Sequence, residues 1–219
     1  MGDRDARNAL FDQFARVGKA LGSGKRLELL DLLAQGERTV EALARAAQLG
    51  TTTASAHLQT LKQANLVATR REGTKIYYRL AGTDVAALYA LVRTVASTHL
   101  PDVAAARTAY LGSDDAEPVS REELLRRAES GDVVVLDVRP REEYEAGHIP
   151  GAVSIPVDEL ADRLGEIPVD QEVVAYCRGS FCVLSHDAVR LLTAHGRSAR
   201  RLADGMLEWQ LAELPVETT

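Results

Sequence analysis

The sequence predicts two domains of different architecture: a mainly α-helical domain with one β-hairpin, followed by an α/β domain built on a parallel sheet. The chain has 219 residues, enough for two domains of about 100 residues each. Apolar residues recur at helical spacing in the first half, whereas short β-branched runs alternate with helical segments in the second. Charge divides the same way, with 15 Lys and Arg against 10 Asp and Glu in residues 1–112, and 11 against 22 in residues 113–219. The first half is therefore expected to face a polyanion such as nucleic acid.

Four helices are expected before residue 66. An apolar stripe predicts the first helix over about residues 10–21, and a leucine-rich stretch predicts a more buried second helix over residues 27–33. Thr39 is placed to cap a short third helix, which stops at Leu49-Gly50. A fourth helix opens at Thr51 directly after this tight turn. Two short helices joined in this way predict a helix-turn-helix.

A β-hairpin follows the fourth helix. Residues 67–71 and 75–80 are rich in β-branched and aromatic side chains, and they flank Glu72-Gly73-Thr74, where glycine suits the turn. A helix-turn-helix followed at once by a basic hairpin predicts a winged helix. The hairpin's cations suit contacts with DNA phosphates: Arg70, Arg71, Lys75 and Arg79. Apolar residues after Thr83 then predict one long helix to about Tyr110.

The stretch TTTASAHLQTLKQANLV resembles the recognition helix of ArsR-type repressors, and the wing RREGTKIYYRL agrees with it. The resemblance covers about residues 9–110 and implies a homodimer on a palindromic site in double-stranded operator DNA. It implies that the long last helix forms the dimer seam; packing on its own domain is the alternative. Lys62 and the wing cations would neutralise phosphates. The residues placed against bases or nearby phosphates are Thr52, Thr53, Ser55, His57 and Gln59.

Many ArsR-type proteins sense metals, and this sequence departs from them. Their third helix often carries a Cys-x-Cys pair, whereas VEALARAA has no cysteine. In the last helix, Asp84 and a lone His99 are too few for zinc, which needs about four ligands. We therefore expect no metal site and no cofactor.

The second half begins after a polar linker at residues 111–118. Ser120 and Glu123 predict a capping box for the helix REELLRRAE. Strands are then expected at VVVLDV, AVSIP, EVVAY and SARRLA, and helices at REEYEAG, DELADRLG, FCVLSHDAVRLLTAHG and around Trp209. Such alternation favours a parallel sheet covered on both faces.

Three phrases, LDVRPREEYEAGHIPGAVSIP, YCRGSFC and DGMLEW, resemble a rhodanese domain over about residues 118–217. The resemblance implies that Cys177 accepts a sulfane sulfur as a persulfide. The local chemistry agrees, because a loop between a strand and a helix N-terminus lowers the pKa of a thiol there. Arg178 adds a cation, and Gly179 lets the loop bend. Asp137, Arg139 and Glu142 are expected to form a charge network under the loop.

Cys182 stands where many thiosulfate sulfurtransferases have an arginine, so turnover of thiosulfate is not expected. In a reducing cytosol both cysteines would rest as thiols. Cys182 could attack a Cys177 persulfide or sulfenate to form a disulfide, or the pair could bind arsenite or another thiophile. The alternative is that Cys182 is a small buried apolar residue. Dual-specificity phosphatases need an arginine six positions beyond the cysteine to bind phosphate. This chain has Val183 there, so phosphatase activity is not expected.

These patterns predict a repressor whose operator affinity depends on sulfur or redox chemistry at Cys177, with a small sulfur-containing or thiophilic inducer. One alternative is a sulfurtransferase with an accessory winged helix, and another is a catalytically silent interaction module. The sequence has no apolar run near the ~20 residues that cross a bilayer. Its N-terminal residues lack the layout of a signal peptide, so we expect a cytoplasmic protein with no membrane partner.

Overall fold

The computed structural model describes residues 3–112 and 117–219 and divides into two compact units, Met1–Tyr89 and Ala90–Thr219. The central residues of the predicted linker, 113–116, lie outside the described residues. Within the described residues, no helix is both long and apolar enough to span a membrane.

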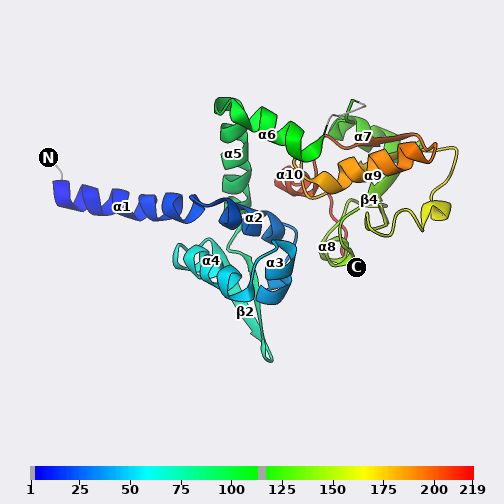
Figure 1. The fold of residues 1–219 in the computed structure, drawn as a ribbon. Coiled ribbons are helices and arrows are strands. Elements are labelled where there is room, and N and C mark those ends of the chain that lie inside the picture. Colours follow the sequence, from blue (N-terminus) through cyan, green and yellow to red (C-terminus); the bar gives the residue numbers. More distant parts are fainter. Residues whose placement is uncertain (1–2, 113–116) are drawn as a thin grey trace. The chain divides into compact units, whose positions relative to one another are not determined.

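The first unit is mainly helical (Figure 1). It carries a small antiparallel sheet with strand order β1-β3-β2. Its elements are α1 (Arg4–Leu21), α2 (Gly24–Leu33), β1 (Arg38–Thr39), α3 (Val40–Ala46), α4 (Thr51–Gln63), β2 (Val67–Glu72), β3 (Lys75–Leu80) and the start of α5 (Thr83–His99). Figure 1 shows the β2–β3 hairpin projecting beyond α3 and α4. This is the predicted winged helix-turn-helix.

Local signals in the sequence produce these elements. The Thr39 hydroxyl accepts a hydrogen bond from the backbone N–H of Ala42 at 3.3 Å and so caps α3, as predicted. Gly73 has a φ of +59° in the hairpin turn, a conformation that favours glycine. A leucine core fills the space between the helices: Leu29, Leu30, Leu43, Leu58 and Leu61. Strand β1 was not predicted, because two residues are too few to show a periodic pattern.

The predicted single helix from Thr83 to Tyr110 is wrong. The structure has two helices, α5 and α6 (Asp102–Leu111), which Leu100 and Pro101 separate. Proline has no backbone N–H, and its ring disfavours the helical conformation of the residue before it, so Pro101 ends α5.

The second unit is an α/β structure around a parallel sheet with strand order β5-β4-β6-β7, which confirms the predicted class. Its remaining elements are α7 (Arg121–Glu129), β4 (Val133–Asp137), α8 (Arg141–Ala146), β5 (Val153–Ser154), the 3-10 helix η1 (Leu164–Glu166), β6 (Glu172–Tyr176), α9 (Val183–Ala194), β7 (Ala199–Arg201) and α10 (Met206–Leu211). The helix predicted at DELADRLG is wrong. This segment consists of turns that end in η1, and Gly165 and Pro168 disfavour a longer helix.

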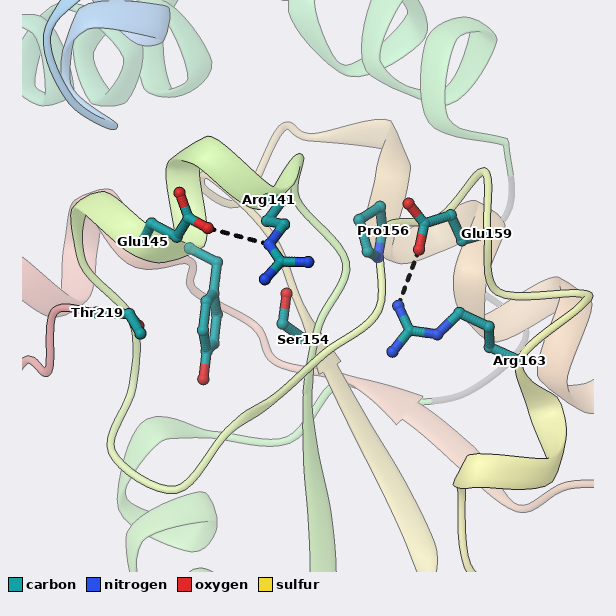
Figure 2. Close-up of a pocket in the computed structure, with 8 residues that line it drawn as sticks. Arg141, Glu145, Ser154, Pro156, Glu159, Arg163 and Thr219 are labelled. Carbon is teal, nitrogen blue, oxygen red and sulfur yellow. Dashed lines mark hydrogen bonds and ion pairs between the residues drawn. The ribbon is translucent and has the colours of Figure 1, made fainter.

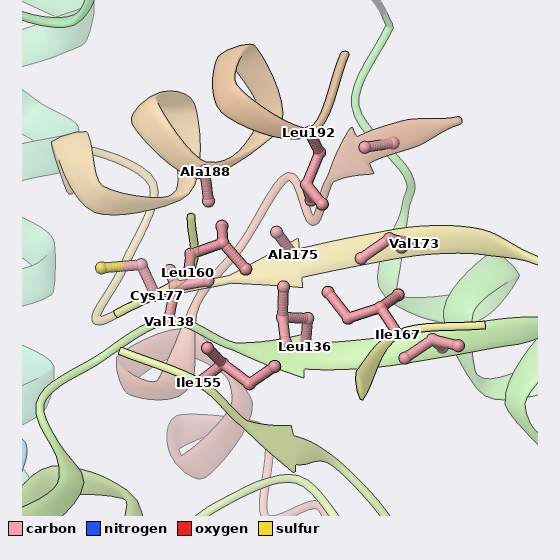
Figure 3. Packing of buried hydrophobic residues seen from close by; sticks show 12 residues of the cluster. Leu136, Val138, Ile155, Leu160, Ile167, Val173, Ala175, Cys177, Ala188 and Leu192 are labelled. Carbon is pink, nitrogen blue, oxygen red and sulfur yellow. The ribbon is translucent and has the colours of Figure 1, made fainter. Parts of the chain in front are cut away.

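The sheet has a separate apolar core on each face. Val173, Ala175 and Cys177 follow one another at alternate positions of β6 and its end, and they pack with Ala188 and Leu192 of α9 (Figure 3). The intervening side chains of β6 contribute to the other core, with Trp209 and Met206 of α10. Successive side chains of a strand point to opposite faces, so the strand pattern itself directs Cys177 toward α9.

Candidate functional site

The cysteine loop, residues 177–182, joins the end of β6 to the start of α9. Cys177 is 1% exposed, and Cys182 is the N-cap residue of α9. The structure joins the two cysteines in a disulfide with a Cα–Cα distance of 6.1 Å, whereas we expected thiols at rest. The turn in which the Cys182 N–H donates to the Gly179 carbonyl at 3.0 Å folds the loop back and brings the cysteines together. The structure therefore holds the oxidised form, the disulfide expected as a product of attack by Cys182.

Helix α10 supports the cysteine loop from a distant part of the sequence. The N–H groups of Met206 and Leu207 donate to the carbonyls of Cys177 and Arg178, both at 2.9 Å. A Cβ atom on Gly205 would lie 2.3 Å from the Gly179 nitrogen, closer than real Cβ atoms come to backbone. The start of α10 thus needs glycine for the close approach of two backbone segments. The motif DGMLEW contributed only to a resemblance, and its sequence did not predict this role.

The positive charge of Arg178 is compensated by a buried carboxylate. Its guanidinium makes hydrogen bonds of 2.6–3.0 Å to the carboxylate of Glu143 in α8, whose side chain is fully buried. Glu142, which we predicted for the charge network, is exposed, and its neighbour Glu143 occupies the buried position beside Arg178. The charge of Arg178 is therefore balanced by a carboxylate that the fold holds in place.

A second buried pair lies at the end of β4. Arg139 binds Asp137 through Nη2–Oδ2 at 2.6 Å and Nε–Oδ1 at 3.0 Å, and both side chains are 0% exposed. The Tyr176 hydroxyl donates to the same carboxylate at 2.5 Å. Burial and the negative charge of Asp137 raise the pKa of Tyr176 well above its ordinary value. Asp137 and Arg139 thus form a buried ion pair next to Tyr176, the residue before the loop.

The α4 face holds the residues predicted to contact DNA bases. Thr52, Ser55 and Gln59 follow one another at helical spacing and line a groove of about 580 Å³, to which Thr74 in the hairpin turn also contributes. Thr53 is exposed and His57 half-buried on the same helix, but neither lines this groove. The structure thus brings three of the five predicted residues together.

The predicted phosphate-binding cations differ in their surroundings. Arg70 is ion-paired with Glu37 and Glu72, and its guanidinium lies 4.3 Å from the centroid of the Tyr77 ring. The hydrogen bonds that Arg70 donates to the Glu37 and Glu72 carboxylates raise its pKa above its already high value. The Arg71 and Lys75 side chains are exposed. Arg70 is therefore compensated by acidic neighbours that no pattern in the sequence indicated.

Polar contacts also fix two α4 side chains against the wing. The Lys62 ammonium donates to the Thr69 hydroxyl at 3.1 Å, and the Gln59 amide donates to the Tyr78 hydroxyl at 3.0 Å. Burial raises the pKa of Tyr78, so this hydroxyl stays protonated at neutral pH. These contacts hold α4 and the β2–β3 hairpin in one arrangement.

A further pocket of about 200 Å³ lies around α8 and β5 (Figure 2). Arg141 and Arg163 both line it, and each is paired inside the pocket, Arg141 with Glu145 at 3.0 Å and Arg163 with Glu159 at 2.8 Å. The positive and negative charges balance there. Neither cysteine is among the described residues that line this pocket.

Comparison with known proteins decides the family. The model of the bacterial regulatory protein, arsR family, matches residues 23–69, and that of the rhodanese-like domain matches residues 120–212. The HTH-type transcriptional regulator Rv0324 of Mycobacterium tuberculosis is 60% identical over 216 residues, which cover 99% of this chain and 95% of that protein. The chain belongs to the ArsR family of transcriptional regulators. Its rhodanese-like domain confirms the second resemblance.

Each half of this ArsR-family regulator also has its own relatives. A sulfurtransferase of Allochromatium vinosum is 32% identical over 102 residues, 47% of this chain and 91% of that protein. A homodimeric winged helix-turn-helix DNA-binding fragment (residues 1–100) from Mycobacterium bovis is 62% identical. It covers 46% of this chain and 93% of its own, with a TM-score of 0.43.

Proposed function

We propose that this ArsR-family regulator is a repressor whose affinity for its operator is set by the oxidation state of Cys177 and Cys182. One observation carries the proposal: the two cysteines are bonded across a six-residue loop between a buried strand and a helix N-terminus. Such a pair changes covalent structure in response to sulfur compounds, and a regulator needs a change of this kind to respond to them.

The chemistry of the pair balances with a persulfide as oxidant. The Cys177 thiolate attacks the outer sulfur of a persulfide R–S–SH, so that a Cys177 persulfide forms and R–SH leaves. The Cys182 thiolate then attacks the Cys177 sulfur, which forms the disulfide and releases hydrogen sulfide. In sum, two thiols are oxidised, and the sulfane sulfur is reduced to sulfide.

The surroundings of the loop support a reactive Cys177. The N-terminus of the twelve-residue helix α9 begins directly after Cys182, and a helix N-terminus stabilises nearby negative charge. The Arg178–Glu143 pair contributes little net charge, so the helix end and the loop N–H groups are the main stabilising features for a thiolate.

The DNA-bound form is proposed to be a homodimer on a palindromic operator in the cytoplasm. Exposed apolar side chains support a second copy as partner: Leu10, Phe11 and Phe14 on α1, and Leu91 and Val95 on α5. In this arrangement Thr52, Ser55 and Gln59 contact base edges, and Arg71 and Lys75 contact phosphates.

The test is binding to the chain's own upstream DNA, followed by fluorescence anisotropy at fixed salt because phosphate contacts make affinity salt-dependent. A persulfide donor should weaken or strengthen wild-type binding by at least about tenfold, which corresponds to about 1.4 kcal/mol. Cys177→Ser should not respond. If the donor leaves wild-type affinity unchanged, the proposal is wrong. An arsenite arm distinguishes a thiophile from a sulfane-sulfur inducer.

A second candidate is a sulfurtransferase whose winged helix only regulates its own gene. The intact strand–loop–helix around Cys177 favours it. Turnover with 3-mercaptopyruvate and cyanide, lost in Cys177→Ser, would support this candidate. A catalytically and allosterically silent domain would instead leave Cys177→Ser equal to wild type in both assays.

A further inference from the structure

The side chain of Arg93, on α5, contacts the cysteine loop. Its Nη2 atom donates to the Ser180 hydroxyl at 2.8 Å and lies 3.1 Å from Oε1 of Glu208. Its guanidinium lies 4.8 Å from the centroid of the Phe181 ring. The Arg93 side chain is only 14% exposed, so these contacts are largely shielded from water. Ser180 and Phe181 are the two residues just before Cys182.

The same side chain also covers Gly179. A Cβ atom at this glycine would lie 3.1 Å from Nη1 of Arg93 and 3.2 Å from the Glu208 carboxylate. Of the four residues between the two cysteines, Gly179, Ser180 and Phe181 therefore all lie against Arg93. Glu208 completes the arrangement, because its Oε2 accepts a hydrogen bond from the N–H of Gly205 at the loop's support. Any rearrangement of residues 179–181 must change the surroundings of Arg93.

Helix α5 connects this contact to the winged helix along the chain itself. It runs without a break from Thr83 to His99, and the boundary between the two units falls inside it, after Tyr89. Tyr89 is one helical turn before Arg93, and its hydroxyl donates to Asp31 of α2 at 3.0 Å. One regular helix thus carries a residue fixed to α2 and, one turn later, a residue fixed to the cysteine loop. In an α-helix each backbone N–H bonds to the carbonyl four residues earlier, so neighbouring turns are linked directly.

We propose that Arg93 is the positioning residue through which the state of the cysteine loop acts on α5 and so on operator affinity. This inference rests on the proposed function, and it names the residue through which the cysteine loop affects α5. With the disulfide closed, residues 179–181 are tethered at both ends, and Arg93 holds them in the arrangement seen here. With Cys177 and Cys182 apart, as two thiols or as a persulfide and a thiol, the tether is lost. The partners of Arg93 then change, which alters the force on α5.

The test compares Arg93→Ala with Arg126→Ala, an exposed arginine of the same unit. Each protein is prepared reduced and persulfide-treated, and the state of the cysteines is measured by mass spectrometry. In wild type and Arg126→Ala the treatment should change operator affinity by about tenfold or more. In Arg93→Ala the cysteines should still react, but operator affinity should change by less than about twofold.

A reciprocal measurement separates coupling from a merely structural role. Because linkage is mutual, operator DNA must shift the thiol–disulfide equilibrium of wild type. Each tenfold shift corresponds to about 30 mV in the midpoint potential of the pair. Arg93→Ala should lose this shift while it still binds DNA. Should Arg93→Ala fail to fold, Arg93→Lys decides, because lysine keeps a charge beside Glu208 but lacks the planar fork that serves Ser180 and Phe181 together.

The outcomes are distinct. If wild type responds and Arg93→Ala, or Arg93→Lys in its place, responds equally, the route through Arg93 is wrong and the proposed function stands. If wild type itself shows no response although its cysteines react, both the proposed function and the route are overturned.

Discussion

The α4 face and the cysteine loop are built in opposite ways. On α4, the groove residues Thr52, Ser55 and Gln59 come from one helix at regular spacing and face outward. In the cysteine loop, a buried thiol position is held by groups from α8, α10 and α5, all distant in sequence. A surface that binds a long polymer can be formed by one helix, whereas a reactive loop must be supported from several sides. Substitutions on α4 should therefore change binding alone, and those around the loop should also change stability.

The largest effect is expected for Gly205→Ala. The new Cβ would meet the Gly179 backbone at 2.3–2.4 Å, so one of two packed segments must move. We expect a loss of about 3 kcal/mol in the unfolding free energy of the second unit, at the upper end for overpacking. Urea unfolding measures it. The matched control is Gly165→Ala, where the structure shows open space around the glycine. Equal stability of the two variants would contradict the close approach of α10 to the loop.

Glu143→Gln should rank second. It leaves the Arg178 guanidinium beside a neutral amide and removes a buried ion pair, which should cost about 2–3 kcal/mol because Arg178 is partly exposed. Thermal unfolding and the rate of Cys177 alkylation in the reduced protein should both change. Glu142→Gln, its exposed neighbour, is the control and should stay within about 0.5 kcal/mol of wild type. If Glu142→Gln destabilised the protein as much as Glu143→Gln, the charge network would instead depend on Glu142, the residue predicted from the sequence.

On the α4 face, Ser55→Ala should weaken operator binding by about tenfold, or about 1.4 kcal/mol, if its hydroxyl contacts a base edge. Binding to unrelated DNA should change little, since phosphate contacts remain. Thr53→Ala, outside the groove, should have a smaller effect. Anisotropy with specific and unrelated duplexes measures both. An equal loss on the two duplexes would remove Ser55 from base recognition.

The smallest expected effect is a difference among the wing cations in how operator affinity depends on salt. Arg71→Ala and Lys75→Ala should each make the negative slope of log affinity against log salt shallower, by about one unit for each protomer of the proposed homodimer. Arg70→Ala should change this slope less, because Glu37 and Glu72 already neutralise Arg70. A salt titration of operator binding decides the order. A full unit of change for each protomer in Arg70→Ala would mean that DNA displaces both carboxylates.

Local signals predicted most of the fold, and the residues around the loop show where such signals end. The Thr39 cap, the Gly73 turn and the parallel class follow from chemistry within a few residues of each position. The break at Pro101 was also a local signal, which the apolar periodicity across it concealed. The choice of Glu143 over Glu142 depends on how α8 is rotated against the loop, which only the packed structure sets.

Contacts between distant segments carried no signal in the sequence. The approach of Gly205 to Gly179 joins residues 26 positions apart, and Arg93 meets Ser180 across 87 positions. The cysteine spacing did suggest shared chemistry, but whether the sulfurs can meet depends on the turn at Gly179. Sequence patterns thus singled out the two cysteines that the structure joins and missed most of the residues that hold their loop.

A redox titration of operator binding tests directly whether the Cys177–Cys182 disulfide sets operator affinity. Samples poised at a series of thiol–disulfide ratios are assayed for operator affinity, and the Cys177–Cys182 disulfide is quantified in each by mass spectrometry. We predict that affinity follows the disulfide fraction in wild type and stays constant in Cys177→Ser and Cys182→Ser. An affinity that remains constant in wild type while the disulfide fraction runs from none to complete would contradict it.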